Sequence, residues 1–84
     1  MATPYAGDVK ALLEFLAKSL VDAPDAVSVE AVDDARGLEL NLSVAEGDYG
    51  KVIGKQGRTA RCLRTIASAA GEKAGKRVTV EIVD

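Results

Sequence analysis

The sequence contains no histidine, no tryptophan and a single cysteine, Cys62. One cysteine cannot form an intramolecular disulfide, and no Cys/His cluster with metal-ligand spacing is present. Histidine, the side chain that most often serves enzymes as a general base, is missing. We therefore expect no disulfide, no metal, no cofactor and no catalytic residue, and we interpret Cys62 as a small, buried or half-buried apolar residue of a helix.

Aromatic residues and long apolar runs are also scarce. Tyr5, Phe15 and Tyr49 are the only aromatic residues, so the core should be aliphatic. No apolar run approaches the roughly 20 residues of a membrane-spanning helix. The N-terminus lacks the basic region and apolar segment of a signal peptide. At 84 residues, 48% of them hydrophobic, the chain has the profile of one small globular domain. We predict a cytoplasmic protein without membrane contact.

Charge is divided unevenly along the chain, although the formal net charge is only −2. Residues 1–50 carry three basic side chains against ten acidic ones, a balance of −7. Residues 51–84 carry eight basic side chains against three acidic ones, a balance of +5. A basic half of this kind indicates a localised anionic partner, with a solvated basic surface as the alternative.

Apolar periodicity predicts six elements. Helical spacing indicates a first helix that is capped by Asp8 and ends before Pro24. Alternation of apolar and polar residues indicates three strands, of which the first two form a hairpin around a turn at 33–37. In chain order we predict a helix at 9–20, strands at 27–32 and 38–44, a short helix at 49–53 capped by Asp48, a longer helix at 58–74 and a strand at 78–83.

This α-β-β-α-α-β order predicts an α+β fold and a single domain over residues 1–84. The strands at 38–44 and 78–83 are joined through two helices, which is the crossover that parallel strands require. We expect a three-stranded mixed sheet covered on one face by three helices. The predicted buried stripe of the 58–74 helix consists of Ala60, Leu63, Ile66, Ala67, Ala70 and Ala74.

A glycine-bounded loop, Gly54-Lys55-Gln56-Gly57, links the last two predicted helices. Glycine accepts backbone angles that are closed to other residues. The helix N-terminus that follows the loop favours an anion such as phosphate. Arg58 in that first turn opposes the helix dipole by about 0.3–1 kcal/mol. An external anion would offset this cost, so a phosphate-backbone partner is favoured over a solvated surface. Lys51 lies before the loop, and Arg61 and Arg64 continue along one side of the helix.

Enzymatic interpretations are poorly supported. The GxxxxGK[ST] spacing of a P-loop is absent, and no predicted strand leads directly into the glycines. Asp33 and Asp34 are explained by turn chemistry without a paired-carboxylate site. We predict that the protein is not an enzyme.

The segment from Val52 to Arg58 resembles the GxxG loop of KH domains: an aliphatic pair, a GxxG with a basic member, and then a helix. The element order is similar to that of type II KH domains. The N-terminal helix, the Val27-Ser28-Val29 strand, the core at 50–58 and the Gly75-Lys76-Arg77-Val78 entry to the last strand together resemble the small bacterial single-KH proteins of the KhpA type.

This resemblance implies a protein that clamps about four nucleotides of single-stranded RNA with the loop. It also implies a homodimer, or a heterodimer with a KH protein of the KhpB (Jag) type, and a role as RNA chaperone, post-transcriptional regulator or factor in cell elongation and division. Val52 and Ile53 are both candidates for an aliphatic groove beside the loop. The candidate RNA-binding residues are Lys51, Val52, Ile53, Gly54, Lys55, Gln56, Gly57 and Arg58, to which helix geometry adds Arg61 and Arg64.

The alternative function is a protein-interaction or dimerisation module in which RNA binding is secondary. Cys62 and Ala69, on the 58–74 helix, are candidates for such an interface. Because two linked loops would raise avidity without new contacts, the two functions are compatible.

Overall fold

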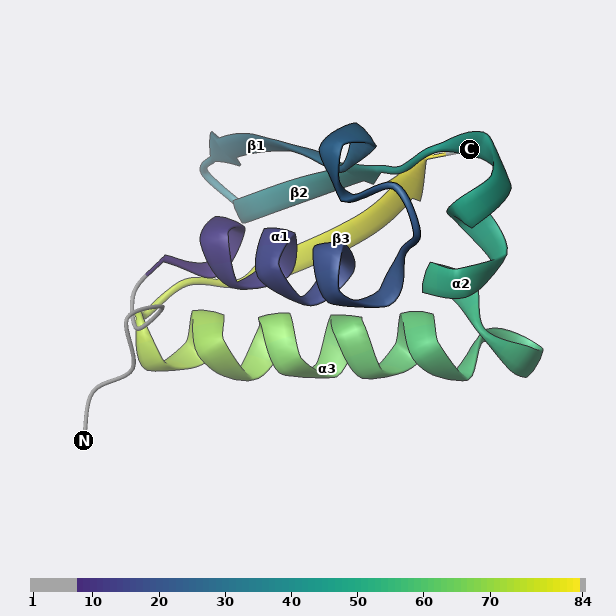
Figure 1. Cartoon of the computed structure of the whole chain (residues 1–84). Coiled ribbons are helices and arrows are strands. Elements are labelled where there is room, and N and C mark those ends of the chain that lie inside the picture. The colour runs from purple at the N-terminus through teal and green to yellow at the C-terminus, as the bar shows by residue number, and fades with distance from the viewer. Residues whose placement is uncertain (1–7, 84) are drawn as a thin grey trace.

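The computed structural model describes residues 8–83, which form the predicted α-β-β-α-α-β order (Figure 1). The predicted domain range of 1–84 also includes residues 1–7 and 84, which lie outside the described part. The main elements are α1 (Val9–Leu20), β1 (Ser28–Asp34), β2 (Gly37–Ser43), α2 (Tyr49–Ile53), α3 (Arg58–Lys73) and β3 (Val78–Val83). Single 3-10 turns precede β1, α2 and α3, namely η1 (Pro24–Ala26), η2 (Glu46–Asp48) and η3 (Lys55–Gly57).

The start of α1 follows from a local side-chain bond. The Asp8 carboxylate accepts a hydrogen bond from the backbone N–H of Ala11, 3.0 Å away. This satisfies one of the amide groups that a helix N-terminus leaves without a partner. The predicted cap of the first helix is therefore confirmed.

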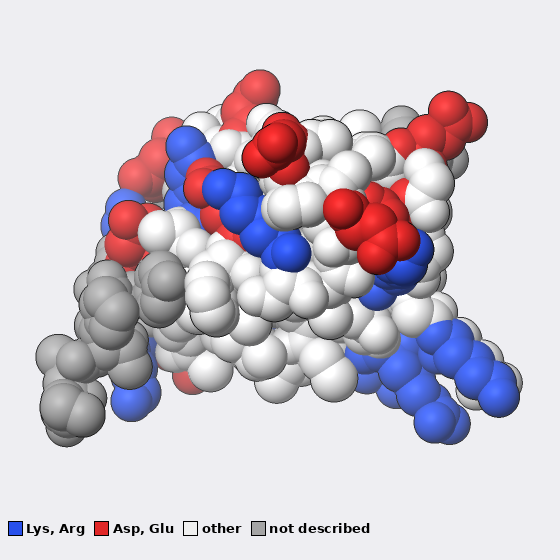
Figure 2. Space-filling view, in the orientation of Figure 1, with Lys and Arg blue, Asp and Glu red and all other residues white. Residues whose placement is uncertain are grey.

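The three strands form one mixed sheet in the order β1-β2-β3. β1 pairs with β2 antiparallel, and β2 pairs with β3 parallel, with Leu40 opposite Val80. All three α-helices lie on one side of this sheet, with α1 and α3 along it and α2 at its end (Figure 1). The other face carries exposed acidic residues, including Glu30, Glu39 and Glu81, and acidic side chains gather on the sheet side of the molecule in Figure 2. The predicted fold class is confirmed.

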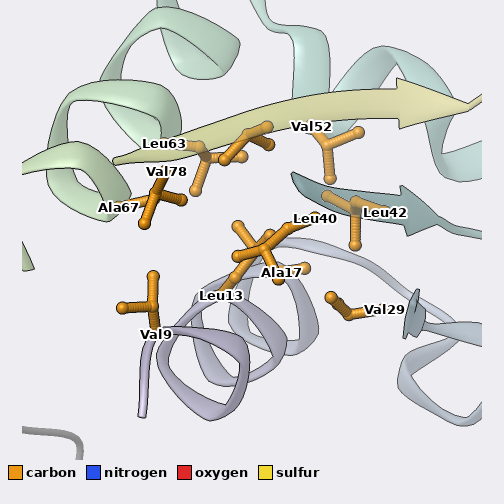
Figure 3. Close-up of a cluster of buried hydrophobic side chains, with 11 residues drawn as sticks. Val9, Leu13, Ala17, Val29, Leu40, Leu42, Val52, Leu63, Ala67 and Val78 are labelled. Carbon is orange, nitrogen blue, oxygen red and sulfur yellow. The ribbon is translucent and has the colours of Figure 1, made fainter. Parts of the chain in front are cut away.

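The core is aliphatic and lies between the sheet and the helices (Figure 3). Leu13, Leu40, Leu42 and Val52 are its largest completely buried side chains. β2 and β3 supply alternate residues to it, as the alternation in the sequence predicts, whereas within β1 only Val29 is buried and Ala31, which the alternation also directs inward, is exposed. Phe15 lies outside the core, since 51% of its surface is exposed.

The predicted buried stripe of α3 is wrong at two positions. Ile66 is 42% exposed, and Ala74 is exposed because α3 ends at Lys73. The buried residues of α3 are Ala60, Leu63, Ala67 and Gly71. At 100° per residue, Ile66 points roughly 100° away from the middle of that line. The sheet covers only a narrow strip of the helix, so Ile66 faces solvent. The prediction that Cys62 is buried or half-buried is wrong for the same reason, since Cys62 is exposed.

Candidate nucleic-acid interface

The glycine loop begins where α2 ends. The N–H of Gly54 donates to the carbonyl of Gly50 at 2.8 Å and closes the last turn of α2. Gly54 has φ 75° and ψ 176°, a conformation that is essentially restricted to glycine. A Cβ at this position would lie 2.7 Å from the Cβ of Thr59 and 2.9 Å from its backbone nitrogen. The first glycine therefore allows the start of α3 to pack directly on the loop.

The second half of the loop reverses the chain. Gln56 (φ 57°) and Gly57 (φ 74°) are both left-handed, and the N–H of Gly57 donates to the carbonyl of Gly54 at 3.2 Å. Gln56 is the one non-glycine residue with positive φ in the described part of the chain. This turn lets α3 begin at Arg58 after a link of only four residues from α2, and it leaves Lys55 and Gln56 exposed.

The N-terminus of α3 is open. Gly57 occupies its N-cap position, no side-chain hydrogen bond caps it in the described structure, and its first turn contains no acidic residue. Its first amide groups therefore lack the side-chain acceptor that usually satisfies one of them. The positive end of the helix dipole adds to their preference for an anion.

Basic side chains gather at this end of the molecule, where they protrude at the lower right of Figure 2. Lys55, Arg58 and Arg61 are all exposed. Within residues 8–83 the ion pairs are formed by Lys51 and Lys76, so no carboxylate neutralises these three cations there.

Arg64 is directed toward the free edge of β3. Its Nε donates to the carbonyl oxygen of Val80 at 3.4 Å, and one turn later the hydroxyl of Ser68 donates to the carbonyl of Val78 at 3.4 Å. The surface beside these contacts has two hollows of about 400 and 510 Å³, which share Ser68 and Glu72. A groove thus follows α3 on the side of β3.

The structure separates the aliphatic pair before the loop. Val52 is completely buried in the core, whereas Ile53 is half-buried. Only Ile53 has surface to offer a ligand beside the loop.

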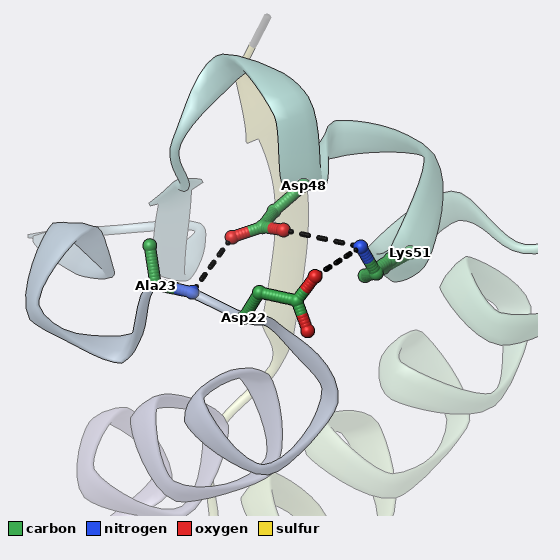
Figure 4. A network of polar contacts seen from close by, with 4 residues as sticks. All are labelled: Asp22, Ala23, Asp48 and Lys51. Atoms are coloured by element: carbon green, nitrogen blue, oxygen red, sulfur yellow. Dashed lines mark hydrogen bonds and ion pairs between the residues drawn. The ribbon is translucent and has the colours of Figure 1, made fainter.

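Lys51 belongs to a polar network that the sequence did not reveal (Figure 4). Its ammonium lies 2.7 Å from Oδ2 of Asp22 and 3.5 Å from Oδ1 of Asp48. The other oxygen of Asp48 accepts a hydrogen bond from the backbone N–H of Ala23 at 3.0 Å. Asp48 therefore stands at the predicted N-cap position of α2, but its side chain bonds elsewhere. In the sequence, the spacing of Asp48 and Lys51 by three residues could have indicated their contact. Nothing in the sequence indicates the hydrogen bond from Ala23.

Burial raises the pKa of Asp48, but the hydrogen bonds from Ala23, Asp22 and Lys51 outweigh it and leave the pKa below its ordinary value of 3.8. The hydrogen bond to Asp22 raises the pKa of Lys51 above 10.5. Both groups are therefore charged at neutral pH, although only 4% of the surface of Asp48 is exposed.

The remaining side chains offer no sign of metal chemistry. No group of His, Cys, Asp and Glu within the described ranges could hold a metal ion. No helix between residues 8 and 83 is long and apolar enough to cross a bilayer.

The chain resembles known proteins over almost its whole length. The sequence model of the KhpA/KhpB KH domain matches residues 10–82. The RNA-binding protein KhpA of Clostridium acetobutylicum is 55% identical over 75 residues, which are 89% of this chain and 100% of that protein. KhpA of Aquifex aeolicus is 47% identical over 76 residues, covering 90% of this chain and 96% of the relative. These relatives are named for RNA binding and not for an enzymatic activity, in agreement with the prediction from the sequence.

A solved structure supports the fold. Aquifex aeolicus Era, bound to GDP and AlF4−, superimposes on 98% of this chain with a TM-score of 0.66. The match spans 31% of the Era chain at 17% sequence identity, so it bears on the fold alone. The identity to the KhpA proteins and the family match over residues 10–82 together show that the chain belongs to the KhpA/KhpB KH-domain family.

Proposed function

We propose that this protein binds single-stranded RNA and grips its phosphate backbone with the loop from Gly54 to Gly57 and the first turn of α3. The observation that carries the proposal is the open N-terminus of α3. Within residues 8–83 it has no acidic residue in its first turn and no side-chain cap, and Lys55 and Arg58 beside it form no ion pair there. Phosphate oxygens match both the amide groups and the cations. The name of the relatives, RNA-binding protein, supports the same ligand.

The groove along α3 begins at Arg64, between one and two turns into the helix that follows the loop, and would give the bases a place along α3. Arg77 directs its carbonyl at β2, where the N–H of Leu38 donates to it at 2.8 Å. The carbonyl groups of successive residues in a strand point to opposite sides. The carbonyl oxygens of Val78 and Val80 therefore point to the free edge of β3. Base edges can hydrogen-bond there, and Ile53 offers an aliphatic surface. With few aromatic residues for stacking, we expect a loose sequence preference.

The basic residues play different parts in this proposal. Lys55 and Arg58 contact phosphate at the loop, and Arg61 extends the basic surface along α3. Arg64 binds at the groove, where its guanidinium can turn from Val80 to a base or phosphate.

A double substitution of the loop tests the proposal. Replacing Lys55 and Gln56 by Asp puts two carboxylates where a phosphate would lie, so binding of a fluorescent single-stranded RNA should be lost in a polarisation assay. Both residues are exposed, and Asp tolerates the left-handed backbone of Gln56, so the fold should survive.

The matched control replaces Lys18 and Ser19 by Asp, which makes the same charge change at exposed positions of α1. This variant should keep most of the affinity. The wild-type affinity should also fall steeply with salt, since each phosphate contact releases counterions and contributes a slope of about −0.7 in log K against log salt concentration. RNA binding by the loop variant would refute the proposal.

A second function, pairing with another KH domain, is favoured by the exposure of Ile66. This residue and the exposed Cys62 and Ala69 lie on one flank of α3. Figure 2 shows a largely uncharged area over α1 and α3. We propose that the flank carries a homodimer or a heterodimer with a KhpB (Jag)-type protein in the cytoplasm. Crosslinking to RNA in cells, followed by sequencing, would distinguish a regulator or RNA chaperone from a factor of cell elongation.

A further inference from the structure

The helix that leads into the loop, α2, is too short to be stable on its own. α2 has five residues, and a helix of this length is not stable without tertiary contacts. Val52 anchors one side of α2 in the core, where it is completely buried. A second anchor is polar and consists of Asp48, the N-cap residue of α2, and Lys51, which lies within α2.

This polar anchor joins two parts of the chain that are distant in sequence. Asp22 and Ala23 directly follow α1, whereas Lys51 lies three residues before Gly54. Lys51 bonds to Asp22, and Asp48 bonds to Ala23, so two separate contacts hold α2 against the segment after α1 (Figure 4). The buried carboxylate of Asp48 uses one oxygen for Ala23 and the other for Lys51.

We infer that Lys51 is a positioning residue and not a phosphate contact: with Asp22 and Asp48 it forms a brace that fixes α2, and through α2 the orientation of the glycine loop. The inference rests on the proposed RNA binding by the loop. Since the loop starts at the last turn of α2, any tilt of α2 moves the amide groups of the loop relative to the N-terminus of α3.

The two possible roles of Lys51, positioning the loop or contacting phosphate, predict opposite changes in RNA affinity when Asp22 is replaced. If Lys51 bound phosphate, loss of the Asp22 carboxylate would release its ammonium and remove a negative charge near RNA, and affinity would rise. If the brace positions the loop, loss of Asp22 loosens α2 and affinity falls. Asp22 is 81% exposed in its side chain, so its replacement by Asn leaves the core intact.

The chain offers a matched control in a second exposed ion pair. Lys76 lies 2.8 Å from Asp33, whose side chain is 58% exposed, and this pair joins the C-terminal end of β1, where the sequence predicts a turn, to the segment before β3. Asp22→Asn and Asp33→Asn remove the same charge from similar pairs. We expect Asp22→Asn to weaken binding of a labelled single-stranded RNA by about threefold or more, the size of effect that positioning residues commonly have. Asp33→Asn should leave the affinity unchanged or slightly higher. An Asp22→Asn variant that binds as tightly as Asp33→Asn would overturn the inference.

A salt titration of Lys51→Gln distinguishes the loss of a phosphate contact from the loss of a positioning residue. A lost phosphate contact makes the negative slope of log K against log salt concentration shallower by about 0.7, whereas a lost positioning residue lowers the affinity at unchanged slope. A reduced slope would show that Lys51 touches RNA. The loop variant with Lys55 and Gln56 replaced by Asp separates the two proposals. If it still binds RNA, the proposed function fails, and if it does not while Asp22→Asn binds normally, only the brace fails.

Discussion

Replacing Gly54 or Gly57 by Ala makes the same chemical change at the two ends of one loop, and the structure predicts unequal losses of stability. Gly57 has φ 74° and ψ 13°, and a Cβ there would meet no atom of the surrounding described residues within 4 Å. Gly54 has ψ 176°, and a Cβ there would meet the side chain and backbone nitrogen of Thr59.

The magnitudes follow from these surroundings. An alanine in the left-handed conformation at position 57 lowers the free energy of unfolding by about 1–2 kcal/mol. The reduced entropy of the unfolded chain offsets about 0.4–1 kcal/mol of this loss. Gly57→Ala should therefore lose about 1 kcal/mol or less. At Gly54 the backbone strain is about 1–3 kcal/mol, and the overlap with Thr59 adds about 1–3 kcal/mol. The entropy term is common to both variants, so from the middle of these ranges the free energy of unfolding of Gly54→Ala should fall by about 2–3 kcal/mol more than that of Gly57→Ala.

Urea unfolding followed by circular dichroism measures this difference. Thermal unfolding gives a second measurement. In a domain of this size 1 kcal/mol corresponds to about 4–8 °C in Tm, so the Tm values of the two variants should differ by roughly 10 °C or more. Removing the side chain of Thr59 in a Gly54→Ala/Thr59→Ala double variant should restore little stability, because the backbone nitrogen of Thr59 lies 2.9 Å from the added Cβ. Equal losses for the two single variants, or a larger loss at Gly57, would refute the account of the loop.

The remaining predictions concern the brace and the flank of α3. Because the pKa of Asp48 is lowered in the folded state, its contribution is present above its unfolded value of 3.8 and is lost as the pH falls through the folded pKa. Asp48→Asn should therefore be less stable than the wild type at neutral pH, and the gap should narrow in acid; a constant gap across an acid titration would contradict this. Ile66→Glu should convert a dimer to a monomer in sedimentation velocity without loss of thermal stability, because Ile66 lies outside the core. A dimer that persists in Ile66→Glu would place the interface elsewhere.

Local sequence patterns were sufficient for the elements and for the loop. Helical spacing placed α1, alternation placed the strands within two residues, and the crossover implied the parallel pairing of β2 with β3. The two glycines with a base between them indicated an anion site because glycine angles and a helix N-terminus are local properties. Apart from the crossover, which depends on the order of the elements, each of these inferences depends on residues a few positions apart.

The buried face of α3 shows where such patterns fail. Apolar spacing placed Ile66 in the core as readily as Leu63, since both lie on the apolar half of the helix. How wide a strip of α3 the sheet covers depends on how α3 lies across β3. The buried residues of α3 include Gly71, and Ile66 lies outside the line that they form.

By itself the sequence determined the element order, the aliphatic core and a basic glycine loop between two helices. Only the tertiary structure decided which side chains are free to meet a ligand there. It buries Val52, directs Arg64 at Val80, and pairs Lys51 with Asp22, 29 residues away in sequence. The reason is physical: backbone conformation depends on neighbours along the chain, whereas the availability of a cation depends on which distant carboxylates packing brings to it.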